Sequence, residues 1–209
     1  STGSGKSTLI NLIPRYYDVT KGSVKVDGVD VRDMTQKELR DKLGYVPQKG
    51  VLFSGTIDSN IRYGKPEITD AQVKEAAEVA QATEFIDTKP EKYESPVSQG
   101  GTNVSGGQKQ RLSIARAIAK DPEIFIFDDS FSALDFKTDS QLRKALKEYT
   151  KDATTVIVAQ RISTILGADQ IIVLDDGHMA GIGTHKELMA NCEVYQQIAR
   201  SQLSEEELA

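Results

Sequence analysis

Apolar residues along the chain fall into two spacings, which predict strands that alternate with helices. Short apolar runs at 123–128, 154–159 and 170–174 have the length and composition of buried strands. The segments 138–149 and 184–200 carry apolar residues at helical spacing. This alternation is typical of a mostly parallel sheet with helices on both faces.

The first part of the chain combines a helix with a hairpin. Residues 4–17 are predicted to be helical after a glycine turn, and residues 22–31 alternate around Asp27-Gly28, which predicts a β-hairpin. A second hairpin of the same kind is expected at 175–183.

A predicted helix at 35–43 follows the first hairpin, because Thr35 and Glu38 have the spacing of a capping box. The next residues, "GYVPQ", predict a short strand that ends at Pro47, since proline has no N–H to donate to a strand ladder.

Between about residues 50 and 120 the pattern changes from strands to helices. Residues 55–64 and 69–86 are predicted to be helical, and a loop rich in Gly, Ser and Asn covers 95–104. A further helix begins at Ser105 and runs to Lys120.

The length of 209 residues suits one domain with a subdomain. We expect a core formed by residues 1–49 and 120–209, an inserted α-helical subdomain at 50–119, and a small antiparallel β part. The chain begins inside a glycine-rich motif, so we also expect the strand that enters this motif to lie upstream of Ser1.

Composition excludes some classes of partner. With 38% hydrophobic and 27% charged residues, the chain resembles an ordinary globular protein. The net charge of −5 argues against nucleic acid, whose backbone requires a basic face. No apolar run approaches the ~18–20 residues that cross a bilayer, so any membrane role is expected to depend on a partner. The single Cys192 excludes an internal disulfide.

The stretch "GSGKST" at residues 3–8, here called the phosphate loop, matches the end of the motif G-x-x-x-x-G-K-[ST]. Backbone N–H groups of such a loop turn around phosphate oxygens, the lysine reaches the outer phosphates, and the next hydroxyl binds Mg²⁺. The expected nucleotide-binding residues here are Thr2, Gly3, Ser4, Gly5, Lys6, Ser7 and Thr8.

The apolar run 124–127 leads directly into two carboxylates, Asp128 and Asp129. In folds with a phosphate loop, a second buried strand ends in a carboxylate that faces the Mg²⁺ ion. Asp128 is therefore expected in the Mg²⁺ shell, and Asp129 is expected next to the γ-phosphate, where it would polarise the attacking water.

The sequence "VSGGQ" at 104–108, here called the signature motif, is the most specific signal. Ser105 and Gln108 form a capping box in sequence, but two glycines in a first turn cost up to about 1 kcal/mol each relative to alanine. Gly106 and Gly107 make sense where a phosphate approaches the backbone closely. Because one nucleotide does not need two such sites, the second would serve a nucleotide held by another subunit.

These motifs together resemble the ATP-binding-cassette (ABC) family, and specifically the nucleotide-binding domains of membrane exporters. Further matching stretches are "YVPQ" (45–48), "VLFSGTI" (51–57), "SPVSQGG" (95–101), "SALD" (132–135), "VIVAQRIST" (156–164) and "DQIIVLDDG" (169–177). The resemblance implies a P-loop NTPase (RecA-like) fold, ATP and Mg²⁺ as cofactors, and a location at the cytoplasmic face of the cell membrane. Val104 stands where the family usually has leucine.

By the same resemblance, two such domains close head to tail around two ATP molecules, each bound by one phosphate loop and the other chain's signature motif. Gln48 would contact Mg²⁺ and relay the nucleotide state to the transmembrane domains. Asp135 would contact the opposite site.

Two residues depart from the family pattern, which usually has glutamate at Asp129 and histidine at Gln160. Aspartate is shorter by about 1.5 Å, and glutamine cannot carry a proton as imidazole does. The resemblance is therefore to the degenerate-site member of a heterodimeric exporter, whose partner chain carries the consensus Glu and His.

Other readings stay open on the sequence alone. DNA-maintenance ATPases and translation ATPases share the signature motif. In DNA-maintenance ATPases a long coiled coil separates the two halves of the cassette, whereas only 57 positions separate Gln48 from Ser105 here. Translation ATPases of this family are tandem cassettes, whereas this chain is a single one. A non-hydrolysing regulatory subunit, in which ATP acts only as a clamp, differs from the main hypothesis in degree.

Overall fold

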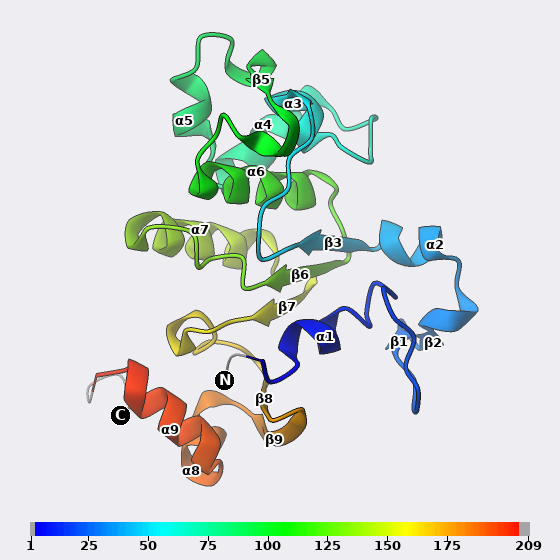
Figure 1. The fold of residues 1–209 in the computed structure, drawn as a ribbon, viewed down its shortest axis with the longest axis vertical. Helices are drawn as coiled ribbons and strands as arrows, with labels where there is room; N and C mark the ends of the chain where they lie inside the picture. The colour runs from blue at the N-terminus through cyan, green and yellow to red at the C-terminus, as the bar shows by residue number, and fades with distance from the viewer. Residues whose placement is uncertain (1–2, 205–209) are drawn as a thin grey trace.

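The computed structural model describes residues 3–204. Its centre is a parallel sheet in the order β3 (Leu43–Val46), β6 (Ile124–Asp128) and β7 (Thr154–Val158), with Phe125 opposite Gly44 and Thr155. The strands expected at 44–47, 123–128 and 154–159 are therefore confirmed. Figure 1 shows the three strands side by side at the middle of the molecule.

The two faces of β6 belong to different hydrophobic cores because successive side chains point to opposite sides of a strand. Ile126 packs in the cluster that contains Ile10 of α1 (Lys6–Ile10). Phe125 and Phe127 pack in the larger cluster with α6 (Gly106–Ala119) and α7 (Phe136–Tyr149). Helices thus cover both faces, as predicted, and α1 and α6 lie on opposite sides of the sheet.

Both predicted hairpins are present. They are formed by β1 (Lys25–Val26) with β2 (Val29–Asp30) and by β8 (Ile171–Asp175) with β9 (His178–Gly183). Each turn is an Asp-Gly pair with positive φ at both residues, 51° and 79° in the first and 45° and 76° in the second. Tight hairpin turns require this geometry. β8 pairs with β9 and is not hydrogen-bonded to the parallel sheet, which differs from our expectation for 170–174.

The segment 50–119 contains α3 (Ile57–Ile61), α4 (Asp70–Val79), α5 (Thr83–Asp87) and most of α6. A short antiparallel pair, β4 (Gly55–Thr56) with β5 (Pro96–Val97), lies on either side of α3, α4 and α5 in the sequence and was not expected. Figure 1 shows these helices stacked at one end of the molecule, beyond β3. No helix in the described residues 3–204 is both long and apolar enough to pass through a bilayer.

Four predicted helices are shorter than expected or divided, and the one predicted at 55–64 is α3 (Ile57–Ile61) alone. α1 ends at Ile10, and Arg15 with φ 56° closes the turns that follow. The helix predicted at 69–86 is two helices, separated where Gln81 has φ 56°. The one predicted at 184–200 divides into α8 (His185–Asn191) and α9 (Glu193–Gln202), because Cys192 has extended backbone. α2 (Gln36–Asp41) has the predicted capping box of Thr35 and Glu38.

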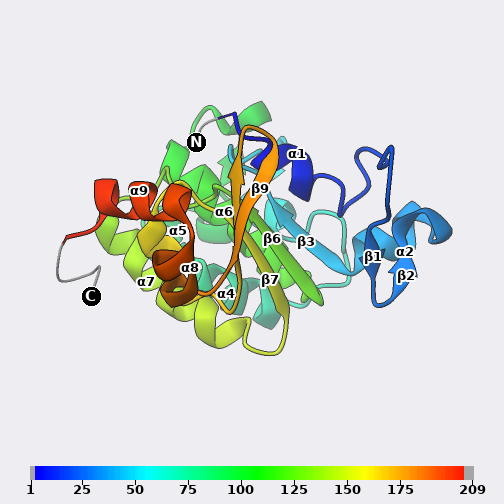
Figure 2. The same ribbon diagram turned by 90° about the horizontal axis from the view of Figure 1, so that it is seen from below.

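Figure 2 views the molecule from below and shows α8 and α9 close to each other, away from β1, β2 and α2. α9 contacts the 3₁₀ turn Ile162–Thr164 and β8. The C-terminal helices are therefore joined to the segment that follows β7.

Candidate nucleotide site

The phosphate loop has the backbone that its glycines make possible. Gly3 and Gly5 have φ of 84° and 93°, in the left-handed region, and a Cβ at either position would meet no atom within 4 Å. Gly5 precedes α1 without any side-chain cap on its first turn. Lys6 Nζ donates a hydrogen bond to Ser4 Oγ at 3.2 Å. Open glycines beside a lysine fit a phosphate, and Thr2 lies outside the described residues.

Ser7 and Asp128 come together from positions far apart in the sequence. Ser7 Oγ donates to Asp128 Oδ1 at 2.9 Å, and the Asp128 side chain ends β6 with only 7% of its surface exposed. A hydroxyl paired with a carboxylate is a donor set that suits Mg²⁺, which prefers oxygen ligands. Two of the three predicted metal ligands, Ser7 and Asp128, are therefore adjacent, whereas the Gln48 side chain contacts Asp129.

Tyr45 adds a contact that the sequence did not indicate. Its hydroxyl donates to Asn11 Oδ1 at 3.0 Å and lies 3.4 Å from Asp128 Oδ2. Burial, together with the negative charge of Asp128, raises the pKa of Tyr45. The phenol consequently stays protonated and can donate a hydrogen bond at neutral pH.

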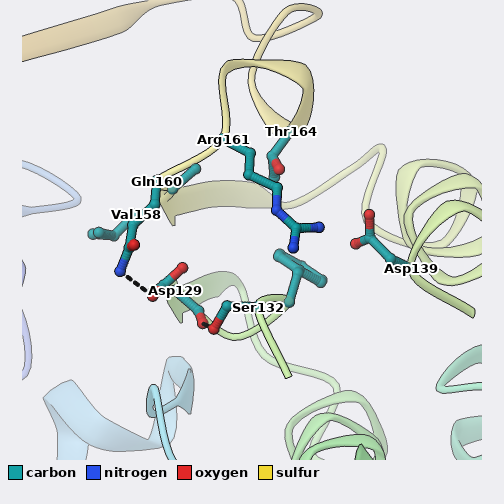
Figure 3. A pocket seen from close by; sticks show the side chains of 9 residues that line it. Asp129, Ser132, Asp139, Val158, Gln160, Arg161 and Thr164 are labelled. Carbon is teal, nitrogen blue, oxygen red and sulfur yellow. Dashed lines mark hydrogen bonds between the residues drawn. The ribbon is translucent and has the colours of Figure 1, made fainter. Parts of the chain in front are cut away.

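Asp129 is held by two glutamine side chains. Its Oδ2 accepts one hydrogen bond from Gln48 Nε2 at 3.0 Å and another from Gln160 Nε2 at 2.6 Å. Its backbone has φ 47° and its N–H donates to Val158 O at 2.9 Å, which turns the side chain toward both amides. Figure 3 shows the Asp129 and Gln160 side chains pointing toward each other. The sequence named all three residues but gave no indication that one carboxylate oxygen joins them.

A pocket of about 260 Å³ lies beside this cluster, lined in part by Asp129, Gln160, Arg161 and Asp139. Arg161 extends into it from the end of β7, and Asp139 faces it from α7 (Figure 3). Asp139 pairs with Arg143 at 2.9 Å on the same helix. The pocket thus has a mixed polar and apolar lining, which includes Asp129 itself.

The segment after Gln48 is anchored on α6. Gln110 Nε2 donates to Pro47 O at 3.0 Å. A Cβ on Gly50 would lie 2.8 Å from the backbone of Lys109, so only glycine allows this close approach. Gln48 therefore lies between two residues that contact α6, Pro47 and Gly50, while its own side chain reaches Asp129.

The signature motif begins α6 as predicted. The Ser105 hydroxyl accepts from Gln108 N at 3.2 Å, and the Gln108 side chain accepts from Ser105 N at 3.2 Å. A Cβ on Gly106 would meet nothing within 4 Å, and Gly107 packs against the loop that leads to Asp135. Asp135 caps α7 by accepting from Thr138 N, and these hydrogen bonds hold the pKa of Asp135 below its ordinary value. The open first turn of α6 lies across the sheet from the phosphate loop.

The fold, with its phosphate loop next to a strand that ends in a carboxylate, is that of a P-loop NTPase. A family model described as ABC transporter matches residues 1–132, so the chain belongs to the ABC transporter family.

Similar proteins cover nearly all of this chain. An uncharacterised ABC transporter ATP-binding protein of Mycobacterium tuberculosis is 50% identical over 205 residues, 97% of this chain and 35% of that protein. A Staphylococcus aureus protein, provisionally named as a multidrug export ATP-binding/permease protein, is 48% identical over 197 residues, 94% of this chain and 34% of that protein.

A solved structure of a bacterial Atm1-family ABC exporter with ATP bound superimposes with a TM-score of 0.94 at 40% identity, covering 98% of this chain and 36% of that one. The chain thus spans about a third of the length of the proteins that it resembles.

Proposed function

We propose that this chain is the ATP-binding domain of a membrane exporter, and that its own site binds Mg²⁺ and ATP but hydrolyses ATP slowly. The similarity to an Atm1-family exporter and to a multidrug export protein supports the exporter assignment. The observation that carries the slow hydrolysis is that Asp129 Oδ2 accepts hydrogen bonds from both Gln48 and Gln160.

ATP binding is assigned to the phosphate loop. Its backbone N–H groups would hold the phosphates, and Lys6 would neutralise the outer ones. Ser7, Asp128 and the side-chain carbonyl of Gln48 would hold Mg²⁺, which shields the negative charge of the phosphates. The contact between Ser7 and Asp128 supports this assignment because it already brings two of the three ligands together.

Slow hydrolysis follows from the position of Asp129. A general base must accept a proton from water at about 2.6–3.2 Å. Here one carboxylate oxygen already accepts two amide donors, and the short side chain limits its reach. Gln160 offers a second amide N–H to a γ-phosphate but cannot shuttle a proton. Catalysis at this site would therefore be weak while binding is retained.

The signature motif is assigned to the nucleotide of a second ABC domain. Two observations support this role. A Cβ on Gly106, in the first turn of α6, would meet nothing within 4 Å, and α6 packs on the opposite face of the sheet from α1, which follows the chain's own phosphate loop. Asp135, next to the same surface, would contact that second site. The partner is proposed to carry Glu and His at the positions of Asp129 and Gln160, and membrane domains would fix both at the cytoplasmic face.

The test compares the full-length protein alone with the full-length protein assembled with its partner. ATP turnover at saturating Mg²⁺ and ATP should be low for the protein alone and high for the pair. A second preparation in which the partner's consensus Glu is replaced by Gln should return the pair to the low rate. Equal turnover by the protein alone would overturn the proposal.

A second candidate function is that of a non-hydrolysing regulatory subunit, which is favoured by the same two hydrogen bonds to Asp129 Oδ2. Under that function the bound ATP stays intact through many transport cycles, whereas slow hydrolysis converts it at a measurable rate. Recovery of labelled nucleotide from this site after a timed incubation distinguishes the two.

A further inference from the structure

Gln202, the last residue of α9, bridges two backbone groups of the segment 159–164, here called the switch segment. Its Nε2 donates to Gln160 O at 2.9 Å, and its Oε1 accepts from Ile162 N at 2.8 Å. One side-chain amide thereby forms hydrogen bonds with the carbonyl of Gln160 and the N–H of Ile162, the residues on either side of Arg161. A neighbouring β-strand would pair with the same backbone groups.

The helix that carries Gln202 is firmly seated. Tyr195 and Ala199 of α9 are 1% and 0% exposed, in a cluster that also contains Ile162 of the switch segment. The Tyr195 hydroxyl and His185 Nδ1 form a hydrogen bond of 2.8 Å, which ties α9 to α8. The position of Gln202 is therefore defined by a helix that is anchored through Tyr195 and Ala199, although Gln202 itself is exposed.

Gln160 takes part in both contacts: its backbone carbonyl accepts from Gln202, and its side chain donates to Asp129. Gln160 Nε2 donates to Asp129 Oδ2 at 2.6 Å, and its amide group has a second N–H that can face a phosphate. A second tether comes from α7, where Arg143 donates to Ser163 O at 3.0 Å. Because of this second tether, loss of the Gln202 bonds should loosen the switch segment without unfolding it.

We propose that Gln202 is a positioning residue that aims Gln160 at the γ-phosphate, so that α9 helps this site to distinguish ATP from ADP. The inference rests on the proposed function, because it requires a γ-phosphate at the site. ADP lacks this phosphate, so its affinity should not depend on the aim of Gln160.

The test measures Kd for labelled ATP and for labelled ADP, each with Mg²⁺, on the full-length protein. Gln202→Ala should weaken ATP binding about tenfold, the value of one hydrogen bond to a charged group, and change ADP binding less than twofold. Gln196→Ala is the matched control, because Gln196 also lies on α9 and donates to Met189 O at 2.8 Å, away from the site. It should leave both Kd values unchanged.

Combining Gln202→Ala with Gln160→Ala separates positioning from a general structural role. In the Gln160→Ala background, Gln202→Ala should have no further effect on the ATP to ADP ratio. An unchanged ratio in the single variant, or equal losses for ATP and ADP, would overturn the inference alone. Wild-type protein that binds ATP no better than Lys6→Ala would overturn the proposed function and this inference together.

Discussion

Replacing Asp129 with glutamate and Gln160 with histidine should convert this site into a fast one. The change extends the carboxylate by one methylene, about 1.5 Å, and removes the amide that donates at 2.6 Å to Asp129 Oδ2. The magnitude can be worked from the hydrogen bond that is removed. A bond to a charged group contributes about 1.5–3 kcal/mol, so losing the Gln160 amide frees the carboxylate by about that amount, while the bond from Gln48 remains.

That free energy corresponds to a factor of about 10–10² in rate. The typical gain from a correctly placed general base is about 10²–10⁴, and the longer glutamate side chain should supply part of it. The double variant should therefore raise phosphate release by about a hundredfold or more. Asp129→Glu alone should give less, because Gln160 can still hold the longer carboxylate.

The assay is steady-state phosphate release by the full-length protein at saturating Mg²⁺ and ATP. Adding Lys6→Ala to the double variant is the control and should abolish the gain, since the lysine is needed to bind the phosphates. A double variant that binds ATP normally but turns over within threefold of wild type would refute the reasoning.

Other expected outcomes concern the caps, the core and the close approach of backbones. Ser105→Ala and Thr69→Ala each remove a capping box and should each lower the free energy of unfolding by about 1 kcal/mol in urea titrations. Only Ser105→Ala should also reduce ATP turnover by the complex with the partner chain. Equal turnover by the Ser105→Ala and Thr69→Ala complexes would contradict the proposed role of the signature motif at the partner's nucleotide. Phe125→Ala should cost about 3–5 kcal/mol, because the ring is 2% exposed; a loss below 1 kcal/mol would contradict this packing. Gly50→Ala should cost about 1–3 kcal/mol by crowding the α6 backbone, whereas Gly167→Ala, in open space, should not.

Local signals in the sequence predicted much of the fold. The Asp-Gly turns, the capping boxes at Thr35 and Ser105, and the proline that ends β3 each act within a few residues. The pairing of Ser7 with Asp128 followed from the order of motifs, because parallel strands present their carboxyl ends at one edge.

Features set by contacts over long sequence distances could not be predicted. The break at Cys192 depends on packing, since nothing in the local pattern interrupts the helix. The contacts of Gln202 with the switch segment join residues about forty positions apart. The sharing of Asp129 Oδ2 by two amides likewise depends on three separate segments meeting, which periodicity does not encode.

A single-turnover measurement tests the central claim most directly. Labelled ATP is mixed with an excess of the full-length protein and Mg²⁺, and the bound nucleotide is identified over time. The account predicts that ATP binds and is recovered largely as ATP, with a cleavage rate constant at least about a hundredfold below the ~10 s⁻¹ typical of enzymes. Conversion of bound ATP to ADP at ~1 s⁻¹ or faster would contradict it.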